Sequence, residues 1–395
     1  MNRHLYTLLL AQFLTALADN AILFAAFALI TQELVRGEWY QPALQASFLL
    51  AFVVLAPWVG RLADSRAKRT VLVLGNGVKG LGALLMWLQF EPLIAYAVVG
   101  IGAAIYGPAK YGILPEMVAE DRLVRANGLI EGSTIVAIVC GAVVGAAAAD
   151  HNISLALAGV LVTYLLSLAI ALLIPAQSPA RQKAAAAIPA FIEMMRGFFT
   201  TSHARFAMLG ASIFWAAAVV LRVMMVAWAP AVLFTTTTSE IANLTVFIAI
   251  GIAIGALLVP WFIPIERLRR ARLAAYAMGA FIILLAVSSD PWLSKFLLFT
   301  IGLCGGIFVV PINAALQELG HRSIGSGGAV AIQNFFENVA MLIATGLYSV
   351  ALAGGIDPVA AVITLGALVI VATTLIAWRL PKVVPMWPHE EGASS

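Results

Sequence analysis

Asp19 and Asn20 interrupt an apolar run near the start of the chain, in the segment QFLTALADNAIL at positions 12–23. A carboxylate there can accept hydrogen bonds from a cation, and an amide can both donate and accept. Gln12, Thr15 and Asp19 follow one another at intervals of three and four residues, so a helix would place them on one face. The pattern indicates a polar stripe that faces ions or polar ligands.

Other charged residues also lie well inside apolar segments: Lys79, Glu131, Arg222 and Glu337. Each would cost about 2.5–3.5 kcal/mol at the middle of a bilayer, so such side chains normally face a protein interior or a watery cavity. Asn127 lies four residues before Glu131, which gives a second polar stripe. Two interpretations stay open, a cavity lined for a polar substrate or structural ion pairs between helices, and the stripes favour the cavity.

The composition identifies the elements that must position these residues as membrane helices. The 395-residue chain is 62% hydrophobic and 11% charged, with mean hydropathy +0.99, whereas soluble proteins carry about 25% charged residues. A spanning helix needs about 20 mostly apolar residues. Twelve segments meet this requirement, near 5–33, 43–63, 70–89, 93–113, 122–149, 153–174, 206–233, 241–263, 271–290, 292–315, 324–352 and 356–380.

The longest break between segments, residues 175–205, carries proline, serine and basic residues and divides the segments six and six. Similar stretches that begin at Gly107 and Val310 repeat a proline, a glutamate and a helix carrying Asn and Glu. Parallel six-helix halves are typical of the major facilitator architecture. We therefore predict an all-α membrane protein of twelve helices. Its parts are an N-terminal bundle over 1–174, a cytoplasmic linker over 175–205, a C-terminal bundle over 206–381 and a cytoplasmic tail over 382–395.

The basic residues orient these segments. If the N-terminus is cytoplasmic, that side receives the arginines and lysines of 61–69, 181–205 and 267–272, while the opposite side keeps only Arg36 and Lys295. This bias follows the positive-inside rule and predicts that both termini are cytoplasmic. The net charge of +4 is thereby explained by topology, and we expect no nucleic-acid partner.

The stretch GRLADSRAKRT, which begins at Gly60, resembles the signature of the loop between helices 2 and 3 in the major facilitator superfamily. Gly60, Asp64, Arg66 and Arg69 match it, and Ala67 stands where a glycine is usual. In that family the aspartate pairs with basic groups and latches the cytoplasmic side, which implies a gate here. A basic loop that only follows the positive-inside rule is the alternative.

Nothing in the sequence predicts a metal or cofactor. Cys140 and Cys304 lie in apolar runs, the five histidines lie at segment ends or in loops, and there is no Walker A pattern. The stretch GNGVKG at 75–80 lies in a predicted span, where a dinucleotide site would need a preceding strand. Its glycines are interpreted as close-packing positions between helices, like the glycine pairs 128/132, 141/145, 251/255 and 302/306.

Longer blocks point to a narrower family: AQFLTALADNAILFA, YGPAKYGILPEMV, RANGLIEGSTIVAI, SIFWAAAVVLRVMMVAWAP and GGIFVVPINAALQE. They resemble the bacterial lysophospholipid transporter family of the major facilitator superfamily, and the likeness runs through nearly the whole chain. It implies an inner-membrane protein, not an enzyme, that moves lysophosphatidylethanolamine and related lysophospholipids to the cytoplasmic leaflet. A separate acyltransferase/acyl-ACP synthetase would reacylate them there. We expect a monomer without cofactors, in contact with membrane lipids.

Such a substrate matches the charges. Arg222 or Lys110 can bind the phosphate, and Asp19, Glu131 or Glu337 can bind an amine, with Asn20 and Asn127 beside them. We expect the headgroup to travel in a central polar cavity while the acyl tail trails through a lateral gap, as the halves rock in alternating access. Asp19 and Arg222 occupy the first helix of each half, so we also expect them to face each other and exchange ionic partners.

Two alternatives remain. A proton-coupled efflux transporter of the same fold would use Asp19 or Glu131 as a proton site. The stretch GAVVGAAAAD, however, lacks the glycine–proline pair that drug/proton antiporters carry in this segment. A membrane enzyme that modifies lipids would need a nucleophile and a base in a recognisable arrangement, and none is evident in the sequence.

Overall fold

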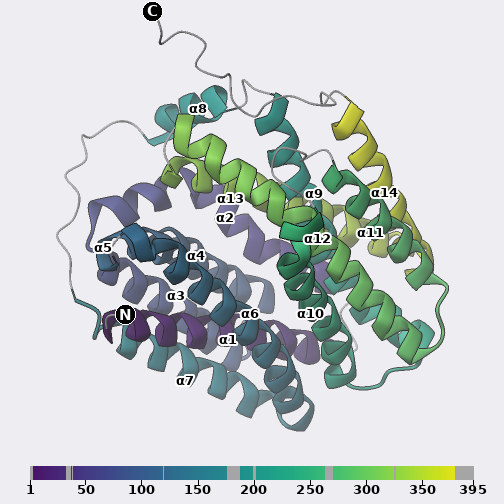
Figure 1. Cartoon of the computed structure of the whole chain (residues 1–395). Helices are drawn as coiled ribbons and strands as arrows, with labels where there is room; N and C mark the ends of the chain where they lie inside the picture. Colours follow the sequence, from purple (N-terminus) through teal and green to yellow (C-terminus); the bar gives the residue numbers. More distant parts are fainter. Residues whose placement is uncertain are drawn as a thin grey trace, which may run out of the picture. The chain divides into compact units, whose positions relative to one another are not determined.

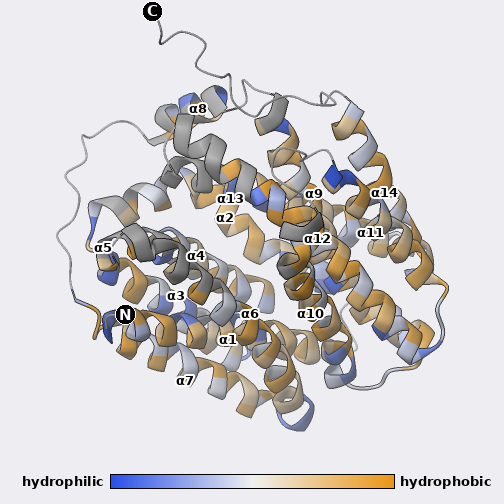
Figure 2. Cartoon of the chain, in the orientation of Figure 1, coloured by the Kyte–Doolittle hydropathy of each residue, from blue (hydrophilic) through white to orange (hydrophobic). Residues whose placement is uncertain are grey.

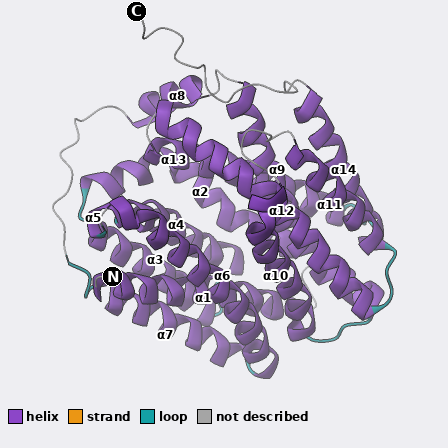
Figure 3. Cartoon of the chain, viewed as in Figure 1, coloured by secondary structure: helices purple, strands orange, loops and turns teal. Residues whose placement is uncertain are grey.

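The computed structural model describes residues 3–32, 37, 39–118, 120–175, 187–198, 202–262, 270–323 and 326–378. The secondary structure assigned in these ranges is helical, as Figure 3 shows. The helices up to residue 171 are α1 (Arg3–Gln32), α2 (Tyr40–Ser65), α3 (Lys68–Trp87), α4 (Pro92–Gly112), α5 (Leu114–Met117), α6 (Glu120–His151) and α7 (Ile153–Ala171).

A twelve-residue helix, α8 (Ala187–Phe198), follows within the predicted linker. The remaining helices are α9 (Ser202–Leu233), α10 (Thr238–Phe262), α11 (Ala271–Ala286), α12 (Pro291–Ser323), α13 (Ser326–Ala353) and α14 (Pro358–Trp378). Figure 1 traces their order along the chain.

These helices confirm the predicted fold class. Eleven of the helices described are long and apolar enough to cross a membrane, and α11 is a shorter apolar helix of 16 residues. Orange, apolar residues predominate along most of them in Figure 2. Large side chains such as Leu347 (66% exposed) and Leu375 (65% exposed) stay uncovered by protein, as expected for helices surrounded by lipid.

Glycines let α6 lie directly against α1. A Cβ atom at Gly141 would be 2.3 Å from the carbonyl oxygen of Leu17, and one at Gly145 would be 2.4 Å from the Cα atom of Ala21. No side chain fits such a gap, so small residues are what allow the two backbones to approach. Asn20 lies at this helix crossing, with its Cβ atom 3.1 Å from the Cβ position of Gly141.

The other predicted close-packing glycines are confirmed in part. A Cβ atom at Gly251 or Gly255 of α10 would be 2.1 or 2.2 Å from backbone oxygens of α12, so close packing is confirmed there. It is confirmed likewise at Gly302 and Gly306 of α12. At Gly132 the prediction is wrong, because nothing lies within 4 Å of the Cβ position, and Gly128 falls outside the described side chains.

Packing divides the chain into two compact units. The first comprises Met1–Ile192, Val219–Val246 and Met341–Pro358, and the second comprises Glu193–Ala218, Phe247–Ala340 and Val359–Ser395. The first unit therefore includes the end of α9, the start of α10 and the end of α13. These units follow packing, whereas the boundaries at 174 and 206 follow the order of the spans, so the division into two bundles stays a prediction.

Candidate functional site

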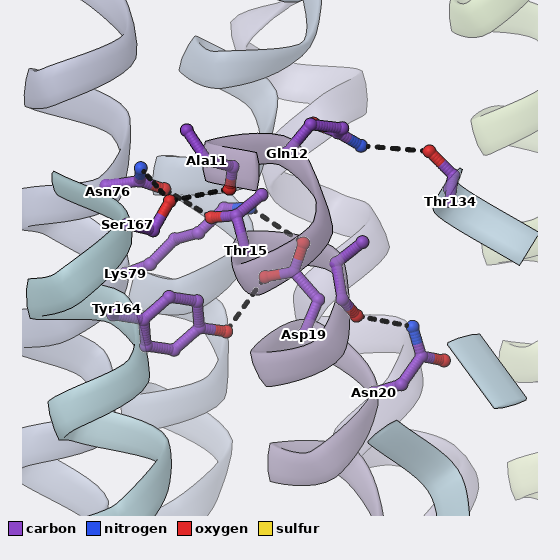
Figure 4. Close-up of polar contacts among 11 residues, drawn as sticks. Ala11, Gln12, Thr15, Asp19, Asn20, Asn76, Lys79, Thr134, Tyr164 and Ser167 are labelled. Atoms are coloured by element: carbon purple, nitrogen blue, oxygen red, sulfur yellow. Dashed lines mark hydrogen bonds and ion pairs between the residues drawn. The ribbon is translucent and has the colours of Figure 1, made fainter. Parts of the chain in front are cut away.

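The carboxylate of Asp19 lies inside the first unit, between three helices. Its Oδ2 atom is 2.7 Å from the Nζ atom of Lys79 in α3, and its Oδ1 atom accepts a 2.8 Å hydrogen bond from the hydroxyl of Tyr164 in α7 (Figure 4). The Lys79 side chain is 2% exposed and that of Asp19 is 24% exposed. Burial thus isolates the lysine from solvent, while the carboxylate keeps some access.

An aromatic side chain supports the same ion pair. The Nζ atom of Lys79 lies 4.9 Å from the ring centre of Tyr106 in α4, which adds a cation–π contact. The charge of Lys79 is therefore balanced by a carboxylate and a ring face, as a buried cation requires.

Uncharged groups continue the network toward the start of α1. Thr15 donates to the amide oxygen of Asn76, Asn76 donates to Ser167 at 2.9 Å, and Ser167 donates to the carbonyl oxygen of Ala11 at 2.7 Å. Figure 4 shows this chain linking α1, α3 and α7. Because Asn76 and Ser167 are fully buried, the hydrogen bond between them and those to Thr15 and Ala11 offset the cost of burying polar groups.

On another side of α1, polar residues contact α6 and α9. Gln12 donates to the hydroxyl of Thr134 at 3.1 Å. The Nη2 atom of Arg222 donates a 2.9 Å hydrogen bond to the Oδ1 atom of Asn20, whose own amide group donates to the carbonyl oxygen of Ala16 at 2.9 Å. Asn20 is thereby fixed with its oxygen toward Arg222.

The guanidinium of Arg222 retains binding capacity. Its Nε atom is buried without a hydrogen-bond partner among the residues that the structure describes. Its central carbon lies 5.2 Å from the ring centre of Phe24. An arginine with a spare N–H group is suited to an anion such as phosphate, because the planar guanidinium presents paired donors to two of its oxygens.

Three other predicted site residues lie on α4 and α6. Lys110 is buried near the end of α4. Asn127 and Glu131 belong to α6, but their side chains fall outside the described part of the structure, so their role stays a prediction.

The predicted residue Glu337 lies in the second unit. It is buried on α13, and its Oε1 atom accepts a 2.7 Å hydrogen bond from Gln333, which also donates to Asn313 of α12 at 3.0 Å. The sequence predicted only Glu337 at this place, and the structure adds Gln333 from the same helix and Asn313 from α12.

The predicted gate residues lie where α2 ends and α3 begins. Gly60 belongs to α2, Arg66 is exposed just after that helix, and Arg69 donates to the carbonyl oxygen of Ile174 at 3.4 Å. Asp64 is the last residue but one of α2, and its side chain is not among those described. Lys68, which is not among the residues that match the signature, donates to the carbonyl oxygen of Ala63 at 2.7 Å and so caps α2.

The structure thus joins Asn20 directly to Arg222 and joins Asp19 to Lys79, which the sequence marked only as an intramembrane charge. The sequence did not predict Tyr164 as a site residue, because a tyrosine in an apolar segment is common. Asp19 and Lys79 offset each other's charge, so among the described side chains of this cluster the charge of Arg222 is unbalanced. No three potential metal ligands gather in the part of the chain described.

Comparison with known proteins gives the family. A family model described as Major Facilitator Superfamily matches residues 8–345. The lysophospholipid transporter LplT of Serratia proteamaculans (strain 568) is 42% identical over 356 residues, 89% of each chain. That of Photorhabdus laumondii is 40% identical over 384 residues, 96% of each chain.

Solved structures resemble the chain in fold. The crystal structure of nucleoside transporter NupG has a TM-score of 0.73 at 11% sequence identity, covering 96% of this chain and 100% of that one. A mutant form of NupG has a TM-score of 0.75. At this identity the likeness concerns architecture alone.

Proposed function

The chain belongs to the major facilitator superfamily and, within it, to the bacterial lysophospholipid transporter family, and on this premise we propose that it carries lysophospholipids across the bacterial inner membrane. It is a multi-pass membrane transporter. The transport cycle is alternating access, in which the headgroup crosses inside the protein.

The observation that supports a phosphate-bearing substrate is the Arg222 guanidinium, held by Asn20 with a buried Nε atom unpaired among the described residues. A phosphate oxygen would satisfy this N–H group with a charge-assisted hydrogen bond. Asp19, with its carboxylate partly exposed, would bind the amine of an ethanolamine headgroup. Lys110, Asn127, Glu131 and Glu337 remain further candidates for the cavity lining.

The acyl tail poses a separate physical problem. Burial of a CH₂ group is worth about 0.8 kcal/mol, so a 16-carbon chain would cost about 12 kcal/mol if it were drawn into water. A tail that stays in lipid while the headgroup moves avoids this cost. We therefore place the tail in a lateral gap and expect lysolipids to move faster than diacyl lipids.

The remaining assignments follow the family and the charge distribution. Both termini would be cytoplasmic, the net direction would be toward the cytoplasmic leaflet, and an acyltransferase/acyl-ACP synthetase would reacylate the product. The two six-helix bundles, 1–174 and 206–381, would be the moving bodies, and a monomer would suffice.

Flux in proteoliposomes tests this function. Wild-type protein should move fluorescent lysophosphatidylethanolamine without changing its mass. Arg222→Gln should raise the apparent KM about 10- to 100-fold, the range expected from losing a hydrogen bond to a charged group. Lys295→Gln is the matched control, because that cation lies 4.6 Å from the Trp292 ring, outside the cluster.

Monoacylglycerol, which lacks the phosphate, should not compete with the fluorescent lysophosphatidylethanolamine. Adding it should therefore leave the flux of that lipid unchanged. Equal KM values for wild type and Arg222→Gln would contradict the phosphate assignment. A changed substrate mass would indicate an enzyme, and flux of amphipathic cations that requires a proton gradient would favour the efflux alternative.

A further inference from the structure

The end of α6 is fastened to the start of α10. The carboxylate of Asp150 accepts hydrogen bonds from the backbone N–H groups of Thr238 at 2.9 Å and Ser239 at 2.8 Å, and from the Ser239 hydroxyl. All three residues belong to the first compact unit. A carboxylate at a helix N-terminus is favourable because it satisfies free N–H groups and opposes the helix dipole.

This contact is not needed to start α10. Thr237 and Glu240 already form a capping box: Glu240 accepts from the N–H groups of Thr236 at 2.8 Å and Thr237 at 3.2 Å, and Thr237 accepts from the N–H group of Glu240 at 3.2 Å. A helix with its own cap can form without Asp150. The Asp150 contact therefore fastens one segment to another that is 88 residues away in sequence.

A second hydrogen bond between segments that are distant in sequence lies on the same side of the membrane. The hydroxyl of Ser349, near the end of α13, donates a 2.8 Å hydrogen bond to the carbonyl oxygen of Trp39, just before α2. By the count of spans, the end of α6, the start of α10, the end of α13 and the start of α2 all lie on the membrane face opposite the termini. We call this the far face.

Both contacts join residues of the range 1–174 to residues of the range 206–381. We propose that Asp150, Thr238 and Ser239 form a far-face latch that holds this face closed and must open in each transport cycle. The inference rests on the proposed function, because alternating access requires each face to open in turn. The predicted gate around Asp64 lies on the opposite face.

The strength of the latch suits a reversible contact. Asp150 is exposed, so water can replace its hydrogen bonds when the helices separate. In the larger cases, removal of a helix cap shifts the equilibrium between the capped and the open state by about 5- to 30-fold. Such a contact can bias a face toward closure without locking it.

A remote reporter tests whether the latch holds the whole face. Ser349→Cys, in a background with Cys140→Ala and Cys304→Ala, places a thiol at the second contact, where the native side chain is buried. Adding Asp150→Ala should raise the rate of labelling by a membrane-impermeant maleimide about fivefold or more. Asn152→Ala is the matched control, because Asn152 caps its own helix α7 through Leu155 at 2.9 Å.

Cross-linking tests whether the latch must open. In the background with Cys140→Ala and Cys304→Ala, Asp150→Cys with Ser239→Cys should cross-link under oxidation. Flux of fluorescent lysophosphatidylethanolamine should then fall at least about tenfold, because a face that cannot open blocks alternating access, and it should recover on reduction. Normal flux in the cross-linked protein, or no cross-link at all, would overturn the proposal. Equal labelling of the Ser349→Cys protein in this background with and without Asp150→Ala would also overturn it.

The labelling measurement needs no substrate, so the two proposals fail separately. If reduced protein moves no lysophospholipid, the proposed function is wrong, and labelling still decides whether Asp150 closes the far face.

Discussion

Both oxygens of the Asp19 carboxylate have partners, Lys79 on one and Tyr164 on the other. Lys79 is the more dependent member of the pair, because its side chain is almost fully buried and an unpaired buried ammonium is costly. Asp19 can therefore serve two purposes, anchoring α3 and α7 to α1 and presenting a partly exposed carboxylate.

A double-mutant cycle separates these purposes. Asp19→Asn and Lys79→Gln should each lower the free energy of unfolding by about 1–3 kcal/mol, because the first leaves the buried Lys79 and the second the partly exposed Asp19 without a charged partner. The double variant should lose less than the sum of the singles, by a coupling of about 0.5–3 kcal/mol. Thermal unfolding in detergent measures the cycle.

Flux of the same variants then identifies the role of Asp19. If it binds the headgroup, the double variant should show this coupling in stability but no transport, whereas full transport by the double variant would make the pair a scaffold. Thr163→Ala is the control, because the Thr163 hydroxyl donates within α7 to Gly159.

Asn20 has a different partner, since it accepts a hydrogen bond from Arg222. The exchange of partners between Asp19 and Arg222 stays a prediction about the moving protein. In this structure the neighbouring residues of α1 direct their polar groups to different helices, because successive residues of a helix point about 100° apart.

At the scale of elements, the approach of α6 to α1 positions Asn20 and depends on glycine. Gly145→Ala would bring a Cβ atom within 2.4 Å of the Ala21 backbone, and a backbone atom cannot rotate away. We expect the free energy of unfolding to fall by about 1–3 kcal/mol, as overpacking generally costs. The melting temperature in detergent reports this change.

Gly132→Ala is the matched control on the same helix, where the Cβ position is open. Alanine favours a helix over glycine by about 0.5–1 kcal/mol, so this variant should melt at the same temperature or slightly higher. Equal melting of Gly145→Ala and wild type would contradict the close α1–α6 packing.

At the scale of the whole molecule, alternating access needs contacts that compete across the membrane. The predicted Asp64 gate lies on the face of the termini and the proposed Asp150 latch on the far face. Their balance sets the resting population of the two states, since each contact favours closure of its own face.

Asp64→Asn should keep expression and melting temperature near wild type while it shifts this balance. We expect faster thiol labelling on the face of the termini and altered lysophospholipid flux, because the carboxylate no longer attracts the neighbouring arginines. Ser65→Ala is the control, since the Ser65 hydroxyl donates only locally, to Leu62 at 3.3 Å. Unchanged labelling together with unchanged flux would remove Asp64 from the gate.

The sequence by itself determined the all-helical membrane class, the positions of the spans and the family. Apolar length is a local property, so each span could be predicted from its own residues, and the polar residues Asp19, Asn20 and Arg222 stood out against it. Glycine spacing likewise predicted a close helix approach at Gly141 and Gly145, and the structure identifies α1 as the partner.

Only the tertiary structure decided which polar group meets which. Asp19 pairs with Lys79 across 60 positions, Arg222 with Asn20 across 202, and Asp150 with Ser239 across 89. Helical spacing states which residues share a face, but the partner of that face depends on how distant helices pack. The role of Asp150 could not be predicted from the sequence, because an aspartate at the end of a span is common. Its contact becomes evident only when the N-terminus of another helix lies against it.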